Sequence, residues 1–561
     1  MKSNKTPAWQ NKKFLIVSSI LTLSITCLIF YWNSKKKSLV KSGLEEIVDK
    51  KSKGLYKIKY NDLQLDEIAG SLSISGIQIL ADSTALQSLK GTKEYPSIIF
   101  NVYIPKLNVL GVSTPKALLG KEIFASRLEI VNPRIELVYT GSGNDSALHI
   151  PSNEVYKQVL GNFQRIALNQ IEIINGSLVG RKQKSLDSVF VFDGLSLRLN
   201  HFSIGDTTDS NSSKILFSNS LKADIRTISW RHGNGLYRYA VEGISANSDS
   251  AKVELAEFSI QPLLSEAAFM NKVNTQIDRI DLRLEKIKLD NLRFNELLQE
   301  SLKADSLVVD NANVHVYKDM ARPRDAINRV GNFPHQLLLR IPFKIQIDSA
   351  AIRNGYVAYK QFTPKTKQKA KLFFTRVNTI IRNITNDSAS IAKNRICKAD
   401  VNCLFLDKVG LKSSFSFDLA AANGRFSIDA QLAGFKATIL NKIAEPLAAA
   451  KIEKGQVKKA TIEINGSEYL GRARLALEYD QLKIAVMEKQ RQSKTLSKKP
   501  LASFAANTII KNSNPAGNGE LRITTGEFNR DTNRGFFNLV WRSLYVAIAE
   551  TMGLPTKRNK N

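Results

Sequence analysis

The chain has 561 residues, of which 43% are hydrophobic and 24% are charged, a composition that excludes a disordered chain and allows more than one domain. Its 30 glycines and 15 prolines are too few for a collagen-like or low-complexity protein. Lys and Arg outnumber Asp and Glu by 81 to 51, giving a net charge of +30. That charge favours an anionic partner, although its sign alone does not choose between nucleic acid, anionic lipid and acidic glycan.

An uncharged apolar segment near the N-terminus predicts a membrane anchor. Residues 14–32 number 19 and, as a helix, just span a hydrocarbon core of about 30 Å. A cleaved signal peptide is the alternative, but no small-residue cleavage site follows the segment. The residues expected in the anchor are Phe14, Leu15, Ile16, Leu21, Leu23, Leu28, Phe30, Tyr31 and Trp32.

The lysines on the two sides of this segment nearly balance, so charge alone does not fix the orientation. Because long domains translocate largely regardless of charge, we expect residues 1–13 to be cytoplasmic and the body to lie on the other side of the membrane. Residues 33–54 are expected to form a juxtamembrane helix or linker.

From about residue 55 apolar and polar residues alternate, which predicts strands with one apolar and one wet face. Residues 279–290 show this pattern with a one-residue phase slip before Ile287, and residues 337–348 show it without a break. We therefore expect residues 55–480 to form an elongated, curled, repetitive antiparallel β-sheet with an apolar groove, in a mainly β fold with a few short helices. The candidate groove residues are Ile280, Leu282, Leu284, Leu339, Ile341, Phe343 and Ile345.

A weak internal repeat accompanies the strands, in which one strand stops at an asparagine and a second leaves at once. Asparagine and glycine adopt positive φ at little cost, so these positions are predicted to be hairpin turns. They are centred on Asn132, Asn175, Asn311, Asn354 and Asn465.

Helical spacing is rare in the body. Short helices are expected after Ser152, over residues 262–273, over residues 295–303 and over residues 439–452, where Pro446 should kink or split the helix. Residues 481–515 are expected to form a basic loop region.

Residues 516–561 predict a last strand, an amphipathic helix and a basic tail. The helix either lies on an anionic membrane or docks a membrane partner, or it packs against the last strands and closes the sheet. Its candidate face consists of a stripe formed by Phe536, Val540, Leu544 and Ile548, with Phe537 and Trp541 beside it.

Motifs for catalysis, cofactors and metals are missing from the sequence. The five histidines are scattered, and no metal-ligand spacing or nucleotide-binding loop occurs, so we predict a protein that is not an enzyme and that has no cofactor. Cys397 and Cys403 could pair if the chain folds back between them, whereas in a continuous strand they would lie roughly 20 Å apart. Nucleic acid is not expected either, because no groove-reading element or set of stacking aromatics is visible.

The two ends of the body resemble the AsmA-like family of bacterial envelope proteins. After the anchor, residues 56–60 (YKIKY) lead into residues 63–65 and 70–77, as at the start of these proteins, and the strand–asparagine–strand units are similar too. The ending looks like the C-terminal signature of the large members, in residues 526–531 (GEFNRD), residues 534–538 (RGFFN) and Trp541.

This resemblance implies an inner-membrane protein with a single span, a periplasmic body and a lipid-sized apolar groove. It also implies a role in phospholipid transport or outer-membrane maintenance, with membrane lipids as partners through their anionic headgroups and acyl chains. The alternative is a non-enzymatic envelope scaffold or outer-membrane assembly factor that binds envelope membrane proteins. The resemblance carries over no catalytic residue.

Overall fold

The computed structural model describes residues 52–554 and residues 45, 48 and 49, except for 67, 93–94, 113–121, 141–164, 184–187, 206–214, 233, 298, 490–495, 501, 504–506, 508–509 and 518. The predicted anchor at residues 14–32 and the predicted helix after Ser152 lie outside these residues. Among the described residues, no helix is both long and apolar enough to cross a membrane.

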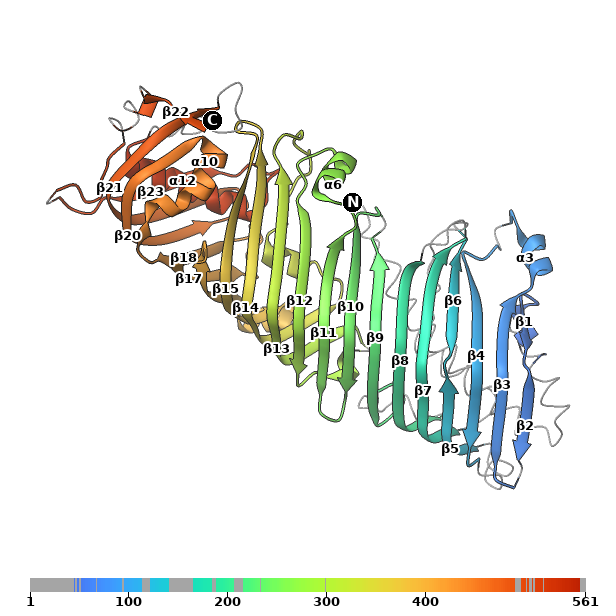
Figure 1. Ribbon diagram of the computed structural model, residues 1–561. Coiled ribbons are helices and arrows are strands. Elements are labelled where there is room, and N and C mark those ends of the chain that lie inside the picture. Colours follow the sequence, from blue (N-terminus) through green and yellow to red (C-terminus); the bar gives the residue numbers. More distant parts are fainter. Residues whose placement is uncertain are drawn as a thin grey trace. The chain divides into compact units, whose positions relative to one another are not determined.

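The chain is mainly β, with few helices (Figure 1). It divides into two compact units. Unit 1 comprises residues 1–232, 239–256 and 292–299, and unit 2 comprises residues 233–238, 257–291 and 300–561. The boundary between the units falls within β10 (Tyr237–Asn247) and β11 (Lys252–Pro262). The predicted mainly β fold is thus confirmed.

Unit 1 is built on a sheet in which β3 pairs with β4, the segments β5 and β6 lie end to end between β4 and β7, and β8 and β9 follow. Its elements are β1 (Tyr56–Lys59), β2 (Asp62–Asp66), β3 (Ser71–Ala81), α3 (Ser83–Leu89), β4 (Ile98–Leu110), β5 (Glu122–Val131), β6 (Arg134–Tyr139), β7 (Arg165–Lys182), β8 (Ser188–Gly205), β9 (Ser220–Arg231) and α7 (Phe294–Leu297).

In unit 2 the strands from β12 to β18 pair in chain order, and β20, β21 and β23 continue the sheet. Its strands are β12 (Arg279–Asp290), β13 (Ser301–Asp319), β14 (Lys344–Thr363), β15 (Gln368–Thr385), β16 (Ile396–Phe405), β17 (Val409–Asp418), β18 (Phe426–Leu432), β19 (Phe435–Lys436), β20 (Ala450–Gly466), β21 (Leu470–Lys489), β22 (Leu496–Lys498) and β23 (Ile523–Asn529). Its helices are α6 (Glu266–Val273), α8 (Pro334–Leu339), α9 (Ser388–Lys393), the 3-10 helix η2 (Ala437–Leu440), α10 (Asn441–Ala448) and α12 (Phe536–Met552).

The expectation of a purely antiparallel sheet is wrong, because each unit contains parallel neighbours. In unit 1, β7 runs parallel to β5 and β6, and in unit 2, β14 runs parallel to β13. In both cases the paired residues are separated by 43 residues in the sequence. The two units therefore share one parallel-strand arrangement with the same offset, a repetition that differs from the strand–turn–strand repeat predicted from the sequence.

A hairpin forms next to Asn465, although its turn lies after Gly466, between the end of β20 and the start of β21. The hairpin prediction is wrong at the other four asparagines. Asn175, Asn311 and Asn354 lie inside single strands, and Asn132 separates the collinear β5 and β6. All four have φ between 50° and 54°. They are kinks at which the strand continues, so a residue that tolerates positive φ does not by itself reverse the chain.

These kinks occur in step on the parallel neighbours. The side-chain amide of Asn175 donates to Oδ1 of Asn132 at 3.0 Å, and that of Asn354 donates to Oδ1 of Asn311 at 2.8 Å. On β12 the predicted phase slip is confirmed, because Lys286 has a φ of 49° and the pairing with β13 shifts there. Each kink adds one residue to its strand, and the apolar positions of the sequence shift by one residue at the same point. Apolar side chains therefore stay on the same face of the sheet on both sides of the kink.

Residues 337–348 do not form one strand, contrary to their alternation. Residues up to Leu339 belong to α8, and β14 begins only at Lys344. Pro334 at the first turn of α8 fits a helix start, the side chain of Gln336 accepts from the amide of Phe333 at 3.1 Å, and Pro342 lacks the amide proton that a strand ladder uses. Local helix-start signals override the period-two pattern here.

Of the other predicted helices, one is confirmed, one is shorter than predicted and one is divided into two. The helix α6 is confirmed and is capped by Ser265, whose hydroxyl accepts from the amide of Ala268. The helix expected over 295–303 ends at Leu297, and the region 439–452 holds η2 and α10, with Pro446 near the end of α10. The strand β21 runs to Lys489, well into the predicted basic loop.

Replacing Asn354 tests whether this position mainly requires a residue that tolerates positive φ or mainly requires the asparagine side chain. We expect Asn354→Val to lower the free energy of unfolding of unit 2 by about 1–3 kcal/mol, because a β-branched residue is strained at a φ of 52°. Asn354→Gly should cost much less, since glycine adopts this φ freely. Hydrogen-exchange mass spectrometry of the full chain, with unit 1 peptides as the internal reference, measures the difference; equal effects of Val and Gly would contradict this account.

Candidate functional site

One apolar row crosses unit 2 from β12 to β23, in register from strand to strand. Residues in register share a face of a sheet, so the row defines one apolar face of unit 2. It consists of Leu289, Leu307, Ala350, Ile381, Ala399, Phe415, Ile428, Ile464, Ala473 and Gly526.

Burial is greatest at the C-terminal end of this row. Ile428, Ile464 and Ala473 are buried there, whereas from Leu289 to Phe415 only Ala350 is buried and the other members are half-buried. A second register row crosses β12–β16 on the other side of the kinks. All of its members are half-buried, as most of the first row is on these strands: Leu282, Val314, Val357, Phe374 and Phe405. The apolar face of β12–β16 is thus partly open to solvent, and we call it the open apolar face.

Unit 1 provides a contrast built from the same pattern. The register row of Leu72, Val109, Leu128, Ile171 and Leu199 crosses its sheet, and each of these side chains is at most 2% exposed. An amphipathic strand pattern is therefore compatible with a closed core in unit 1 and a partly open face in unit 2.

The C-terminal end of the apolar face is closed by α12, which packs on β21 and β23 (Figure 1). Small residues allow the helix to approach the sheet backbone. A Cβ atom at Gly526 would lie 2.3 Å from the amide nitrogen of Ala547, and one at Gly471 would lie 2.3 Å from the hydroxyl oxygen of Ser543. Both strand positions need glycine because no side chain fits between helix and sheet.

Aromatic rings fill the space at the start of α12. Phe536 stacks edge-on against Phe426 at 4.8 Å between ring centroids and against Phe333 at 5.1 Å, and Phe417 lies 5.8 Å away. Phe333 belongs to the crossover between β13 and β14, so this crossover and α12 cover the apolar face together.

Arg530 ties the same crossover to the C-terminal segment. Its guanidinium donates to the backbone carbonyls of Glu468 at 3.2 Å, Arg329 at 2.8 Å and Arg534 at 3.0 Å, and it lies 4.4 Å above the ring of Phe333. The residue is 8% exposed, and burial lowers the pKa of Arg530 from its usual value.

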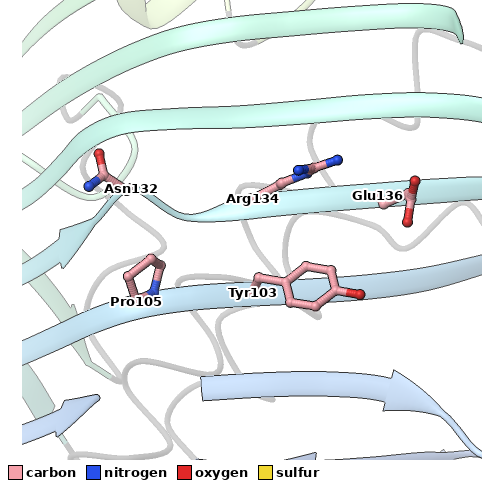
Figure 2. A pocket seen from close by; sticks show the side chains of 5 residues that line it. All are labelled: Tyr103, Pro105, Asn132, Arg134 and Glu136. Carbon is pink, nitrogen blue, oxygen red and sulfur yellow. The ribbon is translucent and has the colours of Figure 1, made fainter. Parts of the chain in front are cut away.

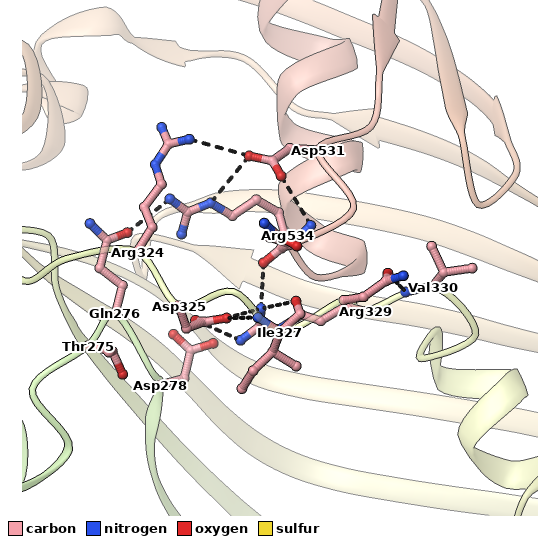
Figure 3. Close-up of polar contacts among 12 residues, drawn as sticks. Thr275, Gln276, Asp278, Arg324, Asp325, Ile327, Arg329, Val330, Asp531 and Arg534 are labelled. Carbon is pink, nitrogen blue, oxygen red and sulfur yellow. Dashed lines mark hydrogen bonds and ion pairs between the residues drawn. The ribbon is translucent and has the colours of Figure 1, made fainter. Parts of the chain in front are cut away.

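Ion pairs and side-chain hydrogen bonds extend this contact (Figure 3). Arg329 binds Asp325 through both terminal nitrogens, at 2.7 and 3.0 Å, which holds the pKa of the Asp325 carboxyl below its usual range. Arg329 also donates to the carbonyl of Asn533 at 2.5 Å, and Arg534 donates to Oε1 of Gln276 at 2.9 Å. We call the contact of residues 320–334 with residues 528–534 the clasp.

The burial of α12 distinguishes two groups among the residues of its predicted face. Of the predicted face, Phe536 is buried, and Val540, Leu544 and Ile548 are half-buried. Phe537 and Trp541 are exposed instead, at 69% and 53%. Packing against the last strands, one of the two alternatives, is what the first group does. Tyr545, which the sequence reasoning missed, is exposed at 45% and lies one helical turn beyond Trp541.

The candidate groove residues fall into two groups. Ile280, Leu282 and Leu284 lie on β12 and Ile345 lies on β14, as strand residues. Leu339 is the last residue of α8, and Ile341 and Phe343 lie between α8 and β14, so these three do not belong to a strand. The half-buried Val314, Val357, Phe374 and Phe405 were missed. Only Val314 lies between two polar neighbours, Asn313 and His315, whereas the other three have an apolar residue next to them, so alternation gave no signal for them.

A pocket of about 360 Å³ lies elsewhere, on the polar face of unit 1 (Figure 2). It is lined by Tyr103, Pro105, Asn132, Arg134 and Glu136. Glu136 already pairs with Arg181 at 3.2 Å. Three of its five lining residues, Asn132, Arg134 and Glu136, are polar or charged.

Reactive groups are sparse in the part of the chain that the structure describes. No group of His, Cys, Asp and Glu there could hold a metal ion. Cys397 and Cys403 are free thiols on the continuous strand β16, and burial raises the pKa of each to about 11, so neither is a ready nucleophile.

No protein-family model and no curated protein matches this chain.

The clasp predicts a large effect of Arg530. We expect Arg530→Ala to lower the free energy of unfolding of unit 2 by about 2–4 kcal/mol, because it leaves buried carbonyls without their donor. Arg474→Ala, which removes only an exposed pair with Glu463, should cost less than about 1 kcal/mol. Urea unfolding followed by Trp541 emission in a background that carries Trp9→Phe, Trp32→Phe and Trp230→Phe measures both. Similar losses for the two variants would argue against the clasp.

His335 predicts a pH dependence in the same region. It is 3% exposed, stacks on Phe417 at 5.0 Å, and neither ring nitrogen has a hydrogen-bond partner among the described residues. Burial lowers the pKa of His335, and the nearby charges of Asp418 and Glu468 oppose this. The unfolded state therefore binds a proton more readily, and stability should fall as the pH drops below about 6.5.

We expect the urea midpoint of unit 2 to decrease between pH 7.5 and 5.5 and His335→Phe to reduce that decrease. Carboxyls with lowered pKa, such as those of Asp325 and Asp418, lose their contribution only below about pH 4, outside this window. An unchanged pH dependence in the His335→Phe variant would exclude His335 as its source.

Proposed function

We propose that this chain is a membrane-anchored, non-enzymatic envelope protein that holds phospholipid acyl chains against the open apolar face of unit 2. On this proposal residues 14–32 span the inner membrane, the body lies in the periplasm, and the role is phospholipid transport or outer-membrane maintenance, as the resemblance to AsmA-like proteins implies. The observation that carries the proposal is the partial exposure of the register row from Leu282 to Phe405.

The physical argument is that a long apolar face in water is unfavourable unless something apolar covers it. Burying apolar surface contributes roughly 25 cal/mol per Å², or about 0.8 kcal/mol for each methylene, so an acyl chain lying across several strands gains several kcal/mol. The register rows run across the strands without a charged member, which suits a long apolar guest. The net charge of +30 supports anionic headgroups as the polar part of that guest.

Site-specific crosslinking tests the proposal. A photoreactive amino acid at Val357, on the open apolar face, should form adducts with membrane phospholipid when the full chain is irradiated in native membranes. The matched control is Val308, which is half-buried on the opposite face of β13. Adducts at both positions, or protein adducts alone at Val357, would count against lipid holding and favour a scaffold.

Charge on the open apolar face should displace the lipid. We expect Val357→Glu to reduce the phospholipid that copurifies with the full chain by about tenfold or more, because a carboxylate against an acyl chain is strongly unfavourable. Val308→Glu should retain it. Quantitative lipid mass spectrometry with urea unfolding of both variants separates lost lipid from lost folding, and unchanged lipid in Val357→Glu would refute the assignment of this face.

A further inference from the structure

The outer surface of α12 carries three exposed aromatic side chains in one row. Phe537, Trp541 and Tyr545 follow each other at intervals of four residues and are 69%, 53% and 45% exposed. Residues four apart on a helix lie one above the other, so the three rings form a stripe along one side of α12. We call this row the aromatic stripe.

The opposite side of α12 fixes the stripe in place. Ser543 and Ala547 are fully buried against Gly471 and Gly526 of the sheet, and the clasp holds the segment that leads into the helix. The rings are therefore presented by a helix that cannot rotate without breaking its backbone contact with β23. A preorganised surface loses little conformational freedom on binding.

One exposed cation lies next to the stripe. The helix α12 contains one arginine, Arg542, and one acidic residue, Glu550, which follows the last ring of the stripe. Arg534 is engaged by Gln276 and Asp531, whereas Arg542 is exposed beside Trp541 with its guanidinium 5.5 Å above the ring of Phe528. Arg542 is therefore the cation placed to meet a negative group next to the stripe.

We propose that the aromatic stripe and Arg542 seat α12 in the headgroup region of an anionic phospholipid membrane. Trp and Tyr have an apolar ring body and a polar tip and prefer the membrane–water interface, while the Phe ring can enter the acyl region. A cation beside them suits an anionic headgroup. A lipid surface fits better than a protein partner, because a straight row of rings can enter a bilayer without a complementary pocket. The exposed Arg542 beside the row matches the negative charge of an anionic headgroup.

This inference deepens the proposed function, on which it rests for the presence of a membrane, by naming a second contact with lipid that is separate from the open apolar face. It gives unit 2 a docking element whose rings reach the bilayer while its small residues stay on the sheet.

The test uses the full chain anchored in nanodiscs. Vesicles of phosphatidylethanolamine with brominated phosphatidylglycerol are added in one arm, and in the other arm the brominated lipid is in the nanodisc itself. The emission of Trp541 is obtained as the difference between the wild-type chain and Trp541→Phe. We expect this emission to be quenched in at least one arm, and the two arms show whether α12 contacts a second membrane or its own.

Variants assign the contact to the stripe. The combined change Phe537→Ser, Trp541→Ser and Tyr545→Ser should weaken membrane binding by at least about tenfold. Binding is measured by vesicle flotation in the first arm and by quenching of a dye attached next to the helix in the second. The matched control replaces three exposed apolar side chains of unit 2 outside the clasp, namely Leu263→Ser, Leu337→Ser and Tyr469→Ser, and should bind as the wild type does. Arg542→Gln should weaken binding to phosphatidylglycerol but not to phosphatidylcholine.

Three results would overturn the inference: no quenching of Trp541 in either arm, equal binding by the stripe and control variants, or protection of α12 only by a membrane protein. Crosslinking at Val357 stays informative in each case, because the open apolar face is unchanged in the stripe variant. Lipid adducts at Val357 without quenching of Trp541 would reject the stripe and keep the proposed function.

Discussion

The structure depends on keeping one face of long strands apolar over their whole length. Strict alternation cannot do this alone, because each kink inserts a residue and would turn the apolar side chains to the other face. The sequence shifts its phase at these positions, as between Leu284 and Ile287 on β12. Neighbouring strands kink together, and the asparagine pairs Asn132–Asn175 and Asn311–Asn354 keep the kinks in register through their side-chain amides.

This constraint explains what could be predicted from the sequence and what could not. Alternation located the strands and even the phase slip on β12, because both are local properties. The asparagines were assigned to hairpins because a tight turn and a kink demand the same positive φ, and only pairing with distant strands decides between them. The same holds for parallel β13 and β14, whose partnership is formed by residues 43 apart and leaves no local signal.

The C-terminal helix shows a different limit. Helical spacing correctly predicted an amphipathic helix, but the larger apolar side chains suggested that Phe537 and Trp541 share one face with Phe536. The orientation is set instead by Ser543 and Ala547, whose small size lets the helix touch the backbone at Gly471 and Gly526. Small residues at a contact carry little hydrophobicity, so patterns based on hydrophobicity underestimate them, and the exposed Phe537 and Trp541 are then grouped with the buried Phe536 on one face.

The contacts of residues 526–531 give a structural reason for one of the sequence features on which the resemblance rests. In residues 526–531, Gly526 makes room for α12, Arg530 binds three backbone carbonyls, and Asp531 meets Arg324 at 3.5 Å. Each of these roles holds the end of the sheet together, and none is chemical. A motif of this kind indicates that the C-terminal end of the sheet is closed. A sheet that is closed firmly at one end can leave its apolar face open along the remaining strands without losing its shape.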